Sequence, residues 1–423
     1  MEASRKWLVP VVAIVVAAVL IIVAVAYLLL KEDESEGSTV VIDGSELATS
    51  GLVDHGTGTF SDPYVINGLD ITVQDVETYS TINGIVVNEV SAHLVISGTT
   101  IHGEDPTPSG QRKLGIWVLD SSNVTILDCM FLDLSDGICL DNSRDIFIAY
   151  NTFHNCSNGV GFSDDEDSRC SNVSINGNNI NSVLYGVSCS RGCSPLSIDG
   201  NVFAHGTHAF NIARSEGVSV TNNSASDISS YVFSVSLSDD VLVAGNTVTN
   251  SFLTGIALSD VSFAEVTDNL IEYGNGISLS YCDHVVISEN VVGHVTGISV
   301  RDSTSIEVTR NNVSESSTGL LVADSRFVNI TYCRIWGCYV GIQLLASENG
   351  ATIVLVHHND IASNDIQALD NSDSNNTWDD GAGEGNYWND YEGVDGDSDG
   401  IGDTPLVIDE DSADRYPLMA SPV

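Results

Sequence analysis

Basic residues are scarce in this chain. Its 423 residues include 14 Lys and Arg against 58 Asp and Glu, which gives a formal net charge of −44. The only lysines are Lys6, Lys31 and Lys113. A surface this acidic repels phosphate backbones, so nucleic acid is not expected as a partner. The acidity fits either a saline or cation-rich medium or simply a soluble, self-repelling exterior, and composition does not decide between the two.

Side chains that bind soft metals are also few. The chain has 3 methionines, one of them Met1, and 10 histidines. The only close histidine groupings are His205 with His208 and the adjacent pair His357 and His358. Because neighbouring residues of a strand point to opposite faces, we expect that His357 and His358 do not share a metal ion. No cluster of Met, His and Cys is present that would support copper binding.

Only one apolar run is long enough to cross a membrane. Residues 8–30 carry no charge, and a helix of that length would span about 35 Å. Arg5 and Lys6 precede the run, while Lys31 is followed at once by acidic residues. By the positive-inside rule, the N-terminus stays in the cytoplasm and the rest is exported. A cleaved signal peptide ending near Ala26 is the alternative.

We therefore expect a single-pass protein of the cell membrane. Its predicted parts are a cytoplasmic stub (1–6), a transmembrane helix (7–30) and an acidic linker (31–38), with residues 31–423 extracellular. An exported chain can be glycosylated, and seven sequons fit this expectation. Their asparagines are Asn123, Asn155, Asn172, Asn222, Asn312, Asn329 and Asn375.

The dominant feature of the exported part is a repeat. The run Gly137-Ile138-x-Leu140, followed by Ile146-x-Ile148 and Asn151-x-Phe153, returns at intervals of 21 to 27 residues up to about residue 361. Apolar residues alternate with polar ones in three short runs per copy, which is the spacing of strands. A fixed period of this length indicates a solenoid. The predicted fold is an all-β, single-stranded, right-handed parallel β-helix of about eleven coils, on the order of 50 Å long.

Asparagine recurs at one turn of each copy, which predicts a ladder of side-chain amides between coils. Cys129 and Cys333 occupy the same slot in their copies. The ladder residues are Asn151, Asn178, Asn201, Asn223, Asn246, Asn269, Asn290, Asn311 and Asn359.

The two ends of the solenoid need covers because a bare coil is an open sheet edge. We expect residues 39–75 to cap the N-terminal coil, residues 76–370 to form the repeats, and residues 371–423 to form an acidic, aromatic C-terminal cap. Two excursions lengthen the coils, one at 103–110 and one at 163–169. Insertions of this kind cluster where solenoids bind their ligands.

The cap holds the strongest local motif, Asp395-x-Asp397-x-Asp399-Gly400-x-x-Asp403. Carboxylates at alternate positions can wrap one hard cation, with the Ile401 carbonyl as a further ligand, so the predicted cofactor is structural calcium. The predicted metal ligands are Asp395, Asp397, Asp399, Ile401 and Asp403. Leu406 stands where an EF-hand has its bidentate Glu, so either a shorter loop or help from Asp409 or Asp411 is required. An acidic, solvated tail is the alternative.

Enzyme chemistry on polysaccharides is a serious competing interpretation. Hydrolysis needs two or three carboxylates facing one groove, for which Asp164, Asp165 and Asp167 are candidates. A lyase needs a base, for which the candidates are Arg112, Arg144, Arg169 and Arg301. None of these residues lies in a distinctive motif, and the catalytic residues remain unassigned.

The chain has 9 cysteines. Their spacing allows one disulfide among Cys170, Cys189 and Cys193, and most of the thiols are expected to be structural.

The repeat and the two ends resemble a known group. The coil, the opening run from Gly56 to Ile66, and the closing runs Gly385 to Trp388 and Asp414 to Leu418 resemble the NosD-like, pectate-lyase-like right-handed β-helix surface proteins, with ends like those of archaeal exported members. The resemblance implies the fold for about residues 40–420 and says little about activity. The motifs Asn-Thr-Asp, Gly-His-Gly and Arg-x-Lys of polygalacturonases and Asp-Pro-His-Asp of alginate epimerases are absent.

The sequence thus predicts a membrane-anchored extracellular β-helix that binds polysaccharide or has a structural or adhesive role in the envelope. Polysaccharide and envelope glycans are its expected partners. A polysaccharide lyase or hydrolase is the first alternative, and a NosD-like factor that matures a metal enzyme is the second. An enzyme would show outward carboxylates and an Arg on one face, whereas a binding protein would show exposed aromatic or Asn side chains.

Overall fold

The structure is a computed structural model of the whole chain, and it describes residues 39–74, 81–104, 112–294, 296–347, 352–372 and 376–423. The predicted stub, transmembrane helix and linker (1–38) lie outside these residues. Among the residues described, no helix is long and apolar enough to cross a membrane.

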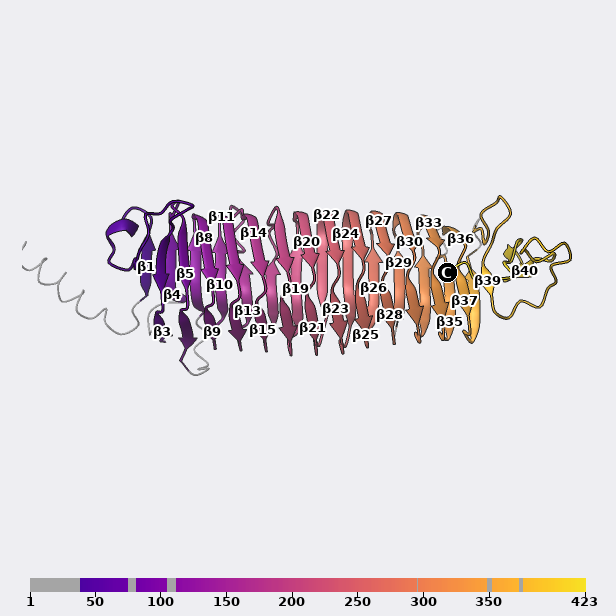
Figure 1. Cartoon of the computed structure of the whole chain (residues 1–423), viewed down its shortest axis with the longest axis horizontal. Helices are drawn as coiled ribbons and strands as arrows, with labels where there is room; N and C mark the ends of the chain where they lie inside the picture. The colour runs from indigo at the N-terminus through magenta and orange to yellow at the C-terminus, as the bar shows by residue number, and fades with distance from the viewer. Residues whose placement is uncertain (1–38, 75–80, 105–111, 295, 348–351, 373–375) are drawn as a thin grey trace, which may run out of the picture.

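The described residues form a parallel β-solenoid with a few more turns than the eleven predicted (Figure 1). Each turn contributes one strand to each of three columns, called here face 1, face 2 and face 3. The strands of face 1 are β1 (Val40–Asp43), β4 (Thr81–Asn88), β7 (Arg112–Leu119), β10 (Asp136–Asp141), β13 (Asn158–Phe162), β16 (Tyr185–Cys189), β19 (His208–Ala213), β22 (Phe233–Ala244), β24 (Thr254–Thr267), β26 (Asn275–Ser280), β29 (Thr296–Arg301), β32 (Thr318–Ala323), β35 (Val340–Leu345) and β38 (Ile366–Asn371).

The strands of face 2 are β2 (Tyr64–Asn67), β5 (Leu94–Ser97), β8 (Ser122–Leu127), β11 (Arg144–Ala149), β14 (Ser171–Asn176), β17 (Leu196–Asp199), β20 (Glu216–Thr221), β27 (Asp283–Ser288), β30 (Thr304–Thr309), β33 (Arg326–Thr331) and β36 (Ile353–His357). The long strands β22 and β24 continue from face 1 onto face 2, which joins both faces into one 25-stranded sheet.

Face 3 is a separate sheet of 14 strands. They are β3 (Asp70–Val73), β6 (Thr100–Gly103), β9 (Met130–Leu132), β12 (Thr152–His154), β15 (Asn179–Asn181), β18 (Val202–Ala204), β21 (Ser224–Ser226), β23 (Thr247–Thr249), β25 (Leu270–Glu272), β28 (Val291–Gly293), β31 (Asn312–Ser314), β34 (Arg334–Trp336), β37 (Asp360–Ala362) and β39 (Tyr387–Trp388). Within the segment predicted to cap the N-terminus, β1, β2 and β3 already follow the solenoid path and pair with β4, β5 and β6, and the 3-10 helix η1 (Leu47–Thr49) lies between β1 and β2.

Three corners connect the faces and are named after them. In the turn that starts with β10, corner 1–2 includes Asn142 and Ser143, corner 2–3 includes Tyr150 and Asn151, and corner 3–1 comprises residues 155–157. The cross-section is therefore three-sided, so face 2 lies opposite corner 3–1.

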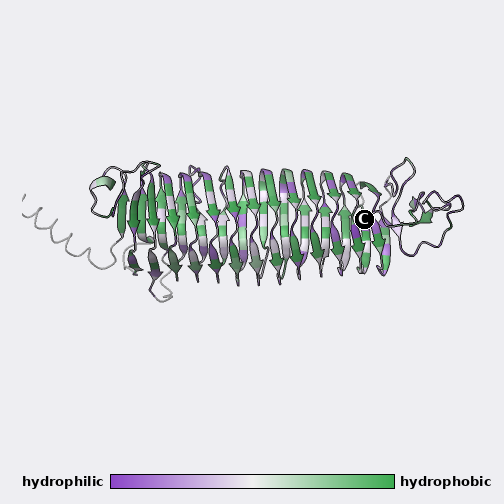
Figure 2. Ribbon diagram, viewed as in Figure 1, coloured by the Kyte–Doolittle hydropathy of each residue, from purple (hydrophilic) through white to green (hydrophobic). Residues whose placement is uncertain are grey.

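The core is the stack of inward side chains that runs the length of the rod. Apolar residues recur on the strands of every turn in Figure 2. Ile116, Ile138 and Val160 are in register on successive turns, and all three are fully buried. The glycine of each repeat is required by close packing: a Cβ on Gly297 would lie 2.0 Å from the carbonyl oxygen of Gly319 in the next turn.

The predicted asparagine ladder is confirmed at corner 2–3. Its amides are buried, and Asn246 Nδ2 donates to Asn269 Oδ1 at 2.9 Å, as Asn223 Nδ2 does to Asn246 Oδ1 at 3.0 Å. Cys129 and Cys333 hold the same slot, where the Cys129 N–H donates to Asn151 Oδ1. The ladder therefore satisfies polar groups that would otherwise be buried without partners.

The C-terminal cap continues this ladder beyond the repeats. Asn359 Nδ2 donates to Asn386 Oδ1 at 2.8 Å, and the Asn386 N–H donates to the buried carboxylate of Asp414 at 2.7 Å. As predicted, aromatic side chains seal the last coil: Trp378 and Trp388 are buried with ring centroids 5.9 Å apart. The hairpin of β40 (Leu406–Val407) and β41 (Ala413–Asp414) follows.

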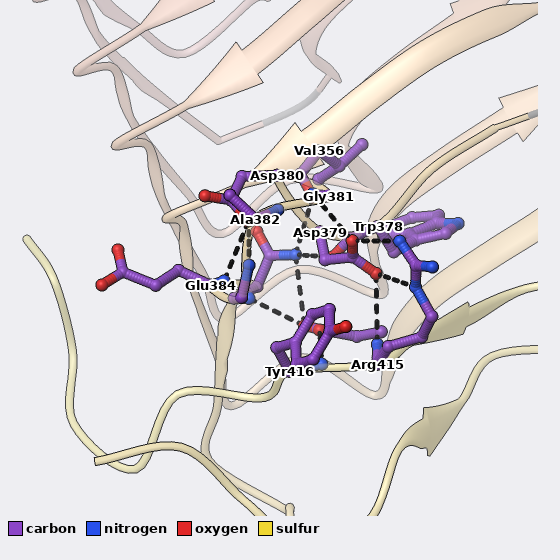
Figure 3. Close-up of polar contacts among 12 residues, drawn as sticks. Val356, Trp378, Asp379, Asp380, Gly381, Ala382, Glu384, Arg415 and Tyr416 are labelled. Atoms are coloured by element: carbon purple, nitrogen blue, oxygen red, sulfur yellow. Dashed lines mark hydrogen bonds and ion pairs between the residues drawn. The ribbon is translucent and has the colours of Figure 1, made fainter. Parts of the chain in front are cut away.

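A buried ion pair fastens the cap. The Arg415 guanidinium donates from Nε and Nη2 to both oxygens of Asp379, at 2.7 and 2.6 Å (Figure 3). Beside it, the Asp380 carboxylate accepts the N–H groups of Ala382, Gly383 and Glu384. The cap is thus tied together by charge-assisted hydrogen bonds.

Candidate functional site

A hollow of about 760 Å³ runs along corner 3–1. Its lining comes from successive corner turns, including Leu134, Cys156, Leu184 and Thr207. Glu104, the first residue after β6, also lines it, so the predicted excursion at 103–110 begins at this hollow. Residues 105–110 of that excursion lie outside the described residues.

A column of polar side chains edges the hollow. Asp133, Asn155, Ser182, His205 and Asp227 take the same position in successive turns, each with φ between 52° and 57°. Asn155 Nδ2 donates to Asp133 Oδ1 at 2.6 Å, and His205 Nδ1 lies 3.7 Å from Asp227 Oδ2. Because turns repeat at about 4.8 Å, the column offers hydrogen-bonding groups at regular intervals along the rod.

Lys113, the only lysine after residue 31, also lies at this hollow. Lys113 is buried, and its Nζ donates to the backbone carbonyl of Glu104 at 2.9 Å. It therefore holds the start of the excursion against the corner.

Stacked aromatic rings border the hollow on face 1. Tyr185 and His208 directly follow the lining residues Leu184 and Thr207, and their ring centroids are 4.6 Å apart. Tyr231 extends the stack with a centroid 6.4 Å from His208, and its side chain is exposed. Burial between the two rings lowers the pKa of His208, so its imidazole is neutral at pH 7.

The same corner carries a second aromatic pair further along the rod. The rings of Tyr273 and His294 stack with centroids 4.5 Å apart and planes within 5°. His294 Nδ1 lies 3.1 Å from a carboxylate oxygen of Glu315 in the next turn. Exposed aromatic and amide side chains thus follow corner 3–1, as expected of a binding protein.

Face 1 also carries an Arg beside a carboxylate, as expected of an enzyme, but the two groups form an ion pair. Arg112 Nε donates to the buried carboxylate of Asp136 at 2.7 Å, and Asn158 donates to its other oxygen. Asp164, a predicted carboxylate candidate, accepts a hydrogen bond from Ser190. Arg112 is therefore occupied by an ion pair and is not a free base.

The other predicted catalytic candidates do not join this cluster. Arg144 pairs with its neighbour Asp145 at 3.8 Å, and Arg169 donates to the carbonyls of Glu166 and Ser168. Arg301 lies at the end of β29, several turns away. Asp165 and Asp167 are exposed within the 163–169 excursion, where the Asp167 N–H donates to Asp165.

The predicted metal ligands are partly brought together. Ligand oxygens of Asp395, Asp397 and Asp399 lie within 4.8 Å of one another. Asp403 is not in this group, and its carboxylate accepts the Gly396 N–H at 2.8 Å. Ile401 forms a bridge to Leu418, which anchors the loop to the end of the chain. Three carboxylates in this geometry suit a hard cation.

The premise that His357 and His358 point to opposite faces is wrong, while the expectation that they do not share a metal ion stays a prediction. His357 and His358 do not point apart: their Nδ1 atoms are 2.5 Å from each other. The reason is the positive φ of 57° at His358, which turns the chain at corner 2–3 and ends the strand alternation. His358 Nε2 also contacts Glu384, so His358 lies between the other two groups. Within the described residues, only the Asp395 group brings three ligand atoms together.

All 9 cysteines are free and buried in the structure. Cys170 and Cys193 are opposite each other in a parallel bridge, as the spacing predicted, but they are not linked. Burial raises the pKa of Cys129 to about 11 and of Cys139 to about 12, which makes both thiols poor nucleophiles and poor metal ligands. These cysteines are core residues.

Glycosylation remains an expectation. Of the seven sequon asparagines, Asn375 lies outside the described residues, and the other six are all at least partly exposed. Asn155 is a special case because it lines the hollow at corner 3–1.

Two models of protein families match this chain. The model of the family described as periplasmic copper-binding protein (NosD) matches residues 168–290 and 254–393, more than half of the chain. The chain belongs to the NosD family. A right-handed β-helix model matches residues 64–210 and supplies the predicted handedness. A search of curated proteins gave no match.

Several solved structures are similar to this chain at low identity. The periplasmic alginate epimerase AlgG has 14% identity and a TM-score of 0.45, over 74% of this chain and 81% of AlgG. PfbA, a surface adhesin of Streptococcus pneumoniae, has 11% identity and a TM-score of 0.40, over 68% and 84%. The tailspike of bacteriophage Det7 has 11% identity and a TM-score of 0.42, over 76% and 78%.

The copper named for the family does not fit the described residues. Copper sites use converging imidazole, thiolate or thioether ligands, but the thiols here are buried in the core. The group that comes nearest to a set of copper ligands is His357, His358 and Glu384. His358 lies between the other two, so the three groups do not converge on one ion.

Proposed function

We propose that this protein binds a polysaccharide at the cell envelope, along corner 3–1. The observation that carries the proposal is the Tyr185–His208–Tyr231 stack beside the polar hollow. Aromatic faces pack against the apolar faces of sugar rings, and amides, hydroxyls and carboxylates hydrogen-bond sugar hydroxyls.

The shape of the corner favours an extended polymer. The polar column from Asp133 to Asp227 and the later pair Tyr273 and His294 follow one line along the rod. A chain lying parallel to the axis meets similar groups at each turn, about every 4.8 Å. The net charge of −44 disfavours acidic polymers, so neutral ones are expected to bind better at low salt.

The test is retention of the full-length protein on immobilised neutral and acidic polysaccharides, with chain length followed in the same samples. Binding without shortening supports the proposal. If no polymer retains the protein, the proposal fails, and a purely structural role in the envelope takes its place.

Polysaccharide processing is the second candidate, because Arg112, Asp136 and Asn158 gather on the outer side of face 1. A lyase or hydrolase would shorten a polymer in the same assay, and Asp136→Asn would abolish that activity. Maturation of a metal enzyme, the second alternative from the sequence, has no support from the ligand chemistry of the described residues.

Two features of the proposal rest mainly on the sequence. The apolar segment 7–30 would anchor the protein in the membrane and place residues 31–423 outside the cell. Extraction of cell membranes at alkaline pH tests this anchor, because an integral membrane protein stays in the pellet. Calcium at Asp395, Asp397 and Asp399, with Ile401 and Asp403 as further predicted ligands, would stabilise the cap.

A further inference from the structure

A second hollow, of about 450 Å³, lies on face 2, on the side of the rod opposite corner 3–1. It spans the face 2 parts of β22, β24 and β27. Its lining is Asp240, Val241, Leu242, Phe263, Ala264, Glu265, His284 and Val286. None of these residues belongs to the groove or stack proposed to bind polysaccharide.

An exposed aromatic pair forms part of its lining. Phe263 and His284 occupy the same position in adjacent turns, and their ring centroids are 5.2 Å apart. The Phe263 side chain is 64% exposed, so its ring contributes little to the core. His284 is held by its neighbour Asp283, whose carboxylate lies 2.8 Å from Nδ1. The Phe263 ring is therefore presented to solvent beside the imidazole of His284.

Two carboxylates flank the rings. Asp240 precedes Phe263 in the same column, and Glu265 lies on the neighbouring outward column of β24. Within the part of the chain that the structure describes, no group hydrogen-bonds or pairs with either carboxylate. The lining contains no Lys or Arg, so the hollow combines negative charge with an aromatic face.

We propose that this hollow binds an organic ammonium group, such as the protonated amine of an amino sugar or a quaternary ammonium. Aromatic faces attract such cations, and unpaired carboxylates add charge complementarity. A bare metal ion fits less well, because Asp240 and Glu265 do not form a converging ligand group. An anion would be repelled.

The probes are a glucosamine hexamer, its fully N-acetylated counterpart and choline, titrated calorimetrically into the full-length protein at low salt. The glucosamine hexamer should bind more tightly than the N-acetylated hexamer, since acetylation removes the charge that the hollow on face 2 attracts. Binding of choline as well would identify any ammonium group as sufficient. Its failure, with the hexamer bound, would restrict the ligand to amino sugars.

Variants assign the site. Phe263→Ala and Asp240→Asn should each weaken binding of the glucosamine hexamer about tenfold. Phe327→Ala is the matched control, since Phe327 is 67% exposed in a later turn and lies outside the hollow. Equal binding of both hexamers, no binding of either, or equal loss in Phe263→Ala and Phe327→Ala would overturn the proposal.

Discussion

The imidazole of His208 stacks on the ring of Tyr185 with centroids 4.6 Å apart and planes 11° apart. Tyr231 covers the other side of the imidazole. Among the residues that the structure describes, the Nδ1 atom of His208 has no hydrogen-bond partner. The structure thus surrounds a titratable group with aromatic surface beside a groove. This arrangement links the stability of the corner to pH and provides the platform for a sugar ring.

The pH dependence follows from the pKa of His208, which burial lowers from its ordinary value of 6.5. Below pH 6.5, the imidazole of His208 takes up a proton more readily in the unfolded chain than in the folded protein. The stability that depends on neutral His208 is therefore complete above pH 6.5 and declines as pH falls through the lower folded pKa. Replacement by Phe keeps the stack but removes the titration.

Urea unfolding between pH 8 and pH 5 should show a smaller loss of stability in His208→Phe than in the unchanged protein. Identical pH profiles for the two proteins would mean that His208 is not shielded between the tyrosines.

The asparagine ladder predicts a large cost for a single deletion. Asn246→Ala removes the buried partners of the Asn223 N–H and the Val220 carbonyl, and one of the two acceptors of Asn223 Nδ2. A loss of about 2–4 kcal/mol in the free energy of unfolding is expected. Asn211→Ala, at a partly exposed position on β19, is the control and should cost less than about 0.5 kcal/mol. Similar costs for both would argue against the ladder.

The ion pair of the cap predicts a local loss of stability. Arg415→Ala strips the buried Asp379 carboxylate of its two strongest donors. We expect destabilisation of about 2 kcal/mol, below the range for fully buried pairs because Arg415 is half exposed. Arg144→Ala removes an exposed pair and should cost less than about 0.5 kcal/mol. Hydrogen exchange should place the Arg415→Ala effect in residues 376–418, and a uniform effect along the rod would contradict it.

Calcium should raise the melting temperature of the full-length protein relative to chelator. Calcium at a hundredfold excess over Kd adds about 2.7 kcal/mol if it binds only the folded state. Asp397→Asn should remove this difference, because Asp397 belongs to the converging carboxylates. Asp302→Asn, outside the cap, should retain it. Equal melting temperatures with calcium and with chelator in the unchanged protein would refute the site.

The sequence predicted the architecture because the repeat controls register directly. The glycine and the two inward residues of each copy, such as Gly137, Ile138 and Leu140, lie in register with those of the neighbouring turns. The asparagine ladder followed from the same spacing. Its extension to Asn386 was missed because that residue lies beyond the last repeat, in a motif of different composition.

The candidate site was harder to predict because it lies at corners. Strand alternation assigns faces within a strand, but residues with positive φ, such as Tyr273 and His358, break that alternation. The stack of Tyr185, His208 and Tyr231 joins residues 23 positions apart that share no motif. Only the long coil before Gly115 hinted at this corner, since its excursion begins at the hollow.

The most direct test of polysaccharide binding compares two tyrosine variants on whichever polymer retains the protein. Tyr231→Ala removes the exposed end of the stack, whereas Tyr281→Ala removes a still more exposed ring at corner 1–2. Binding to the polymer should weaken about tenfold in Tyr231→Ala, the usual scale for an aromatic contact residue, and stay unchanged in Tyr281→Ala. Undiminished binding by Tyr231→Ala, or an equal loss in both variants, would contradict the assignment of the glycan to corner 3–1.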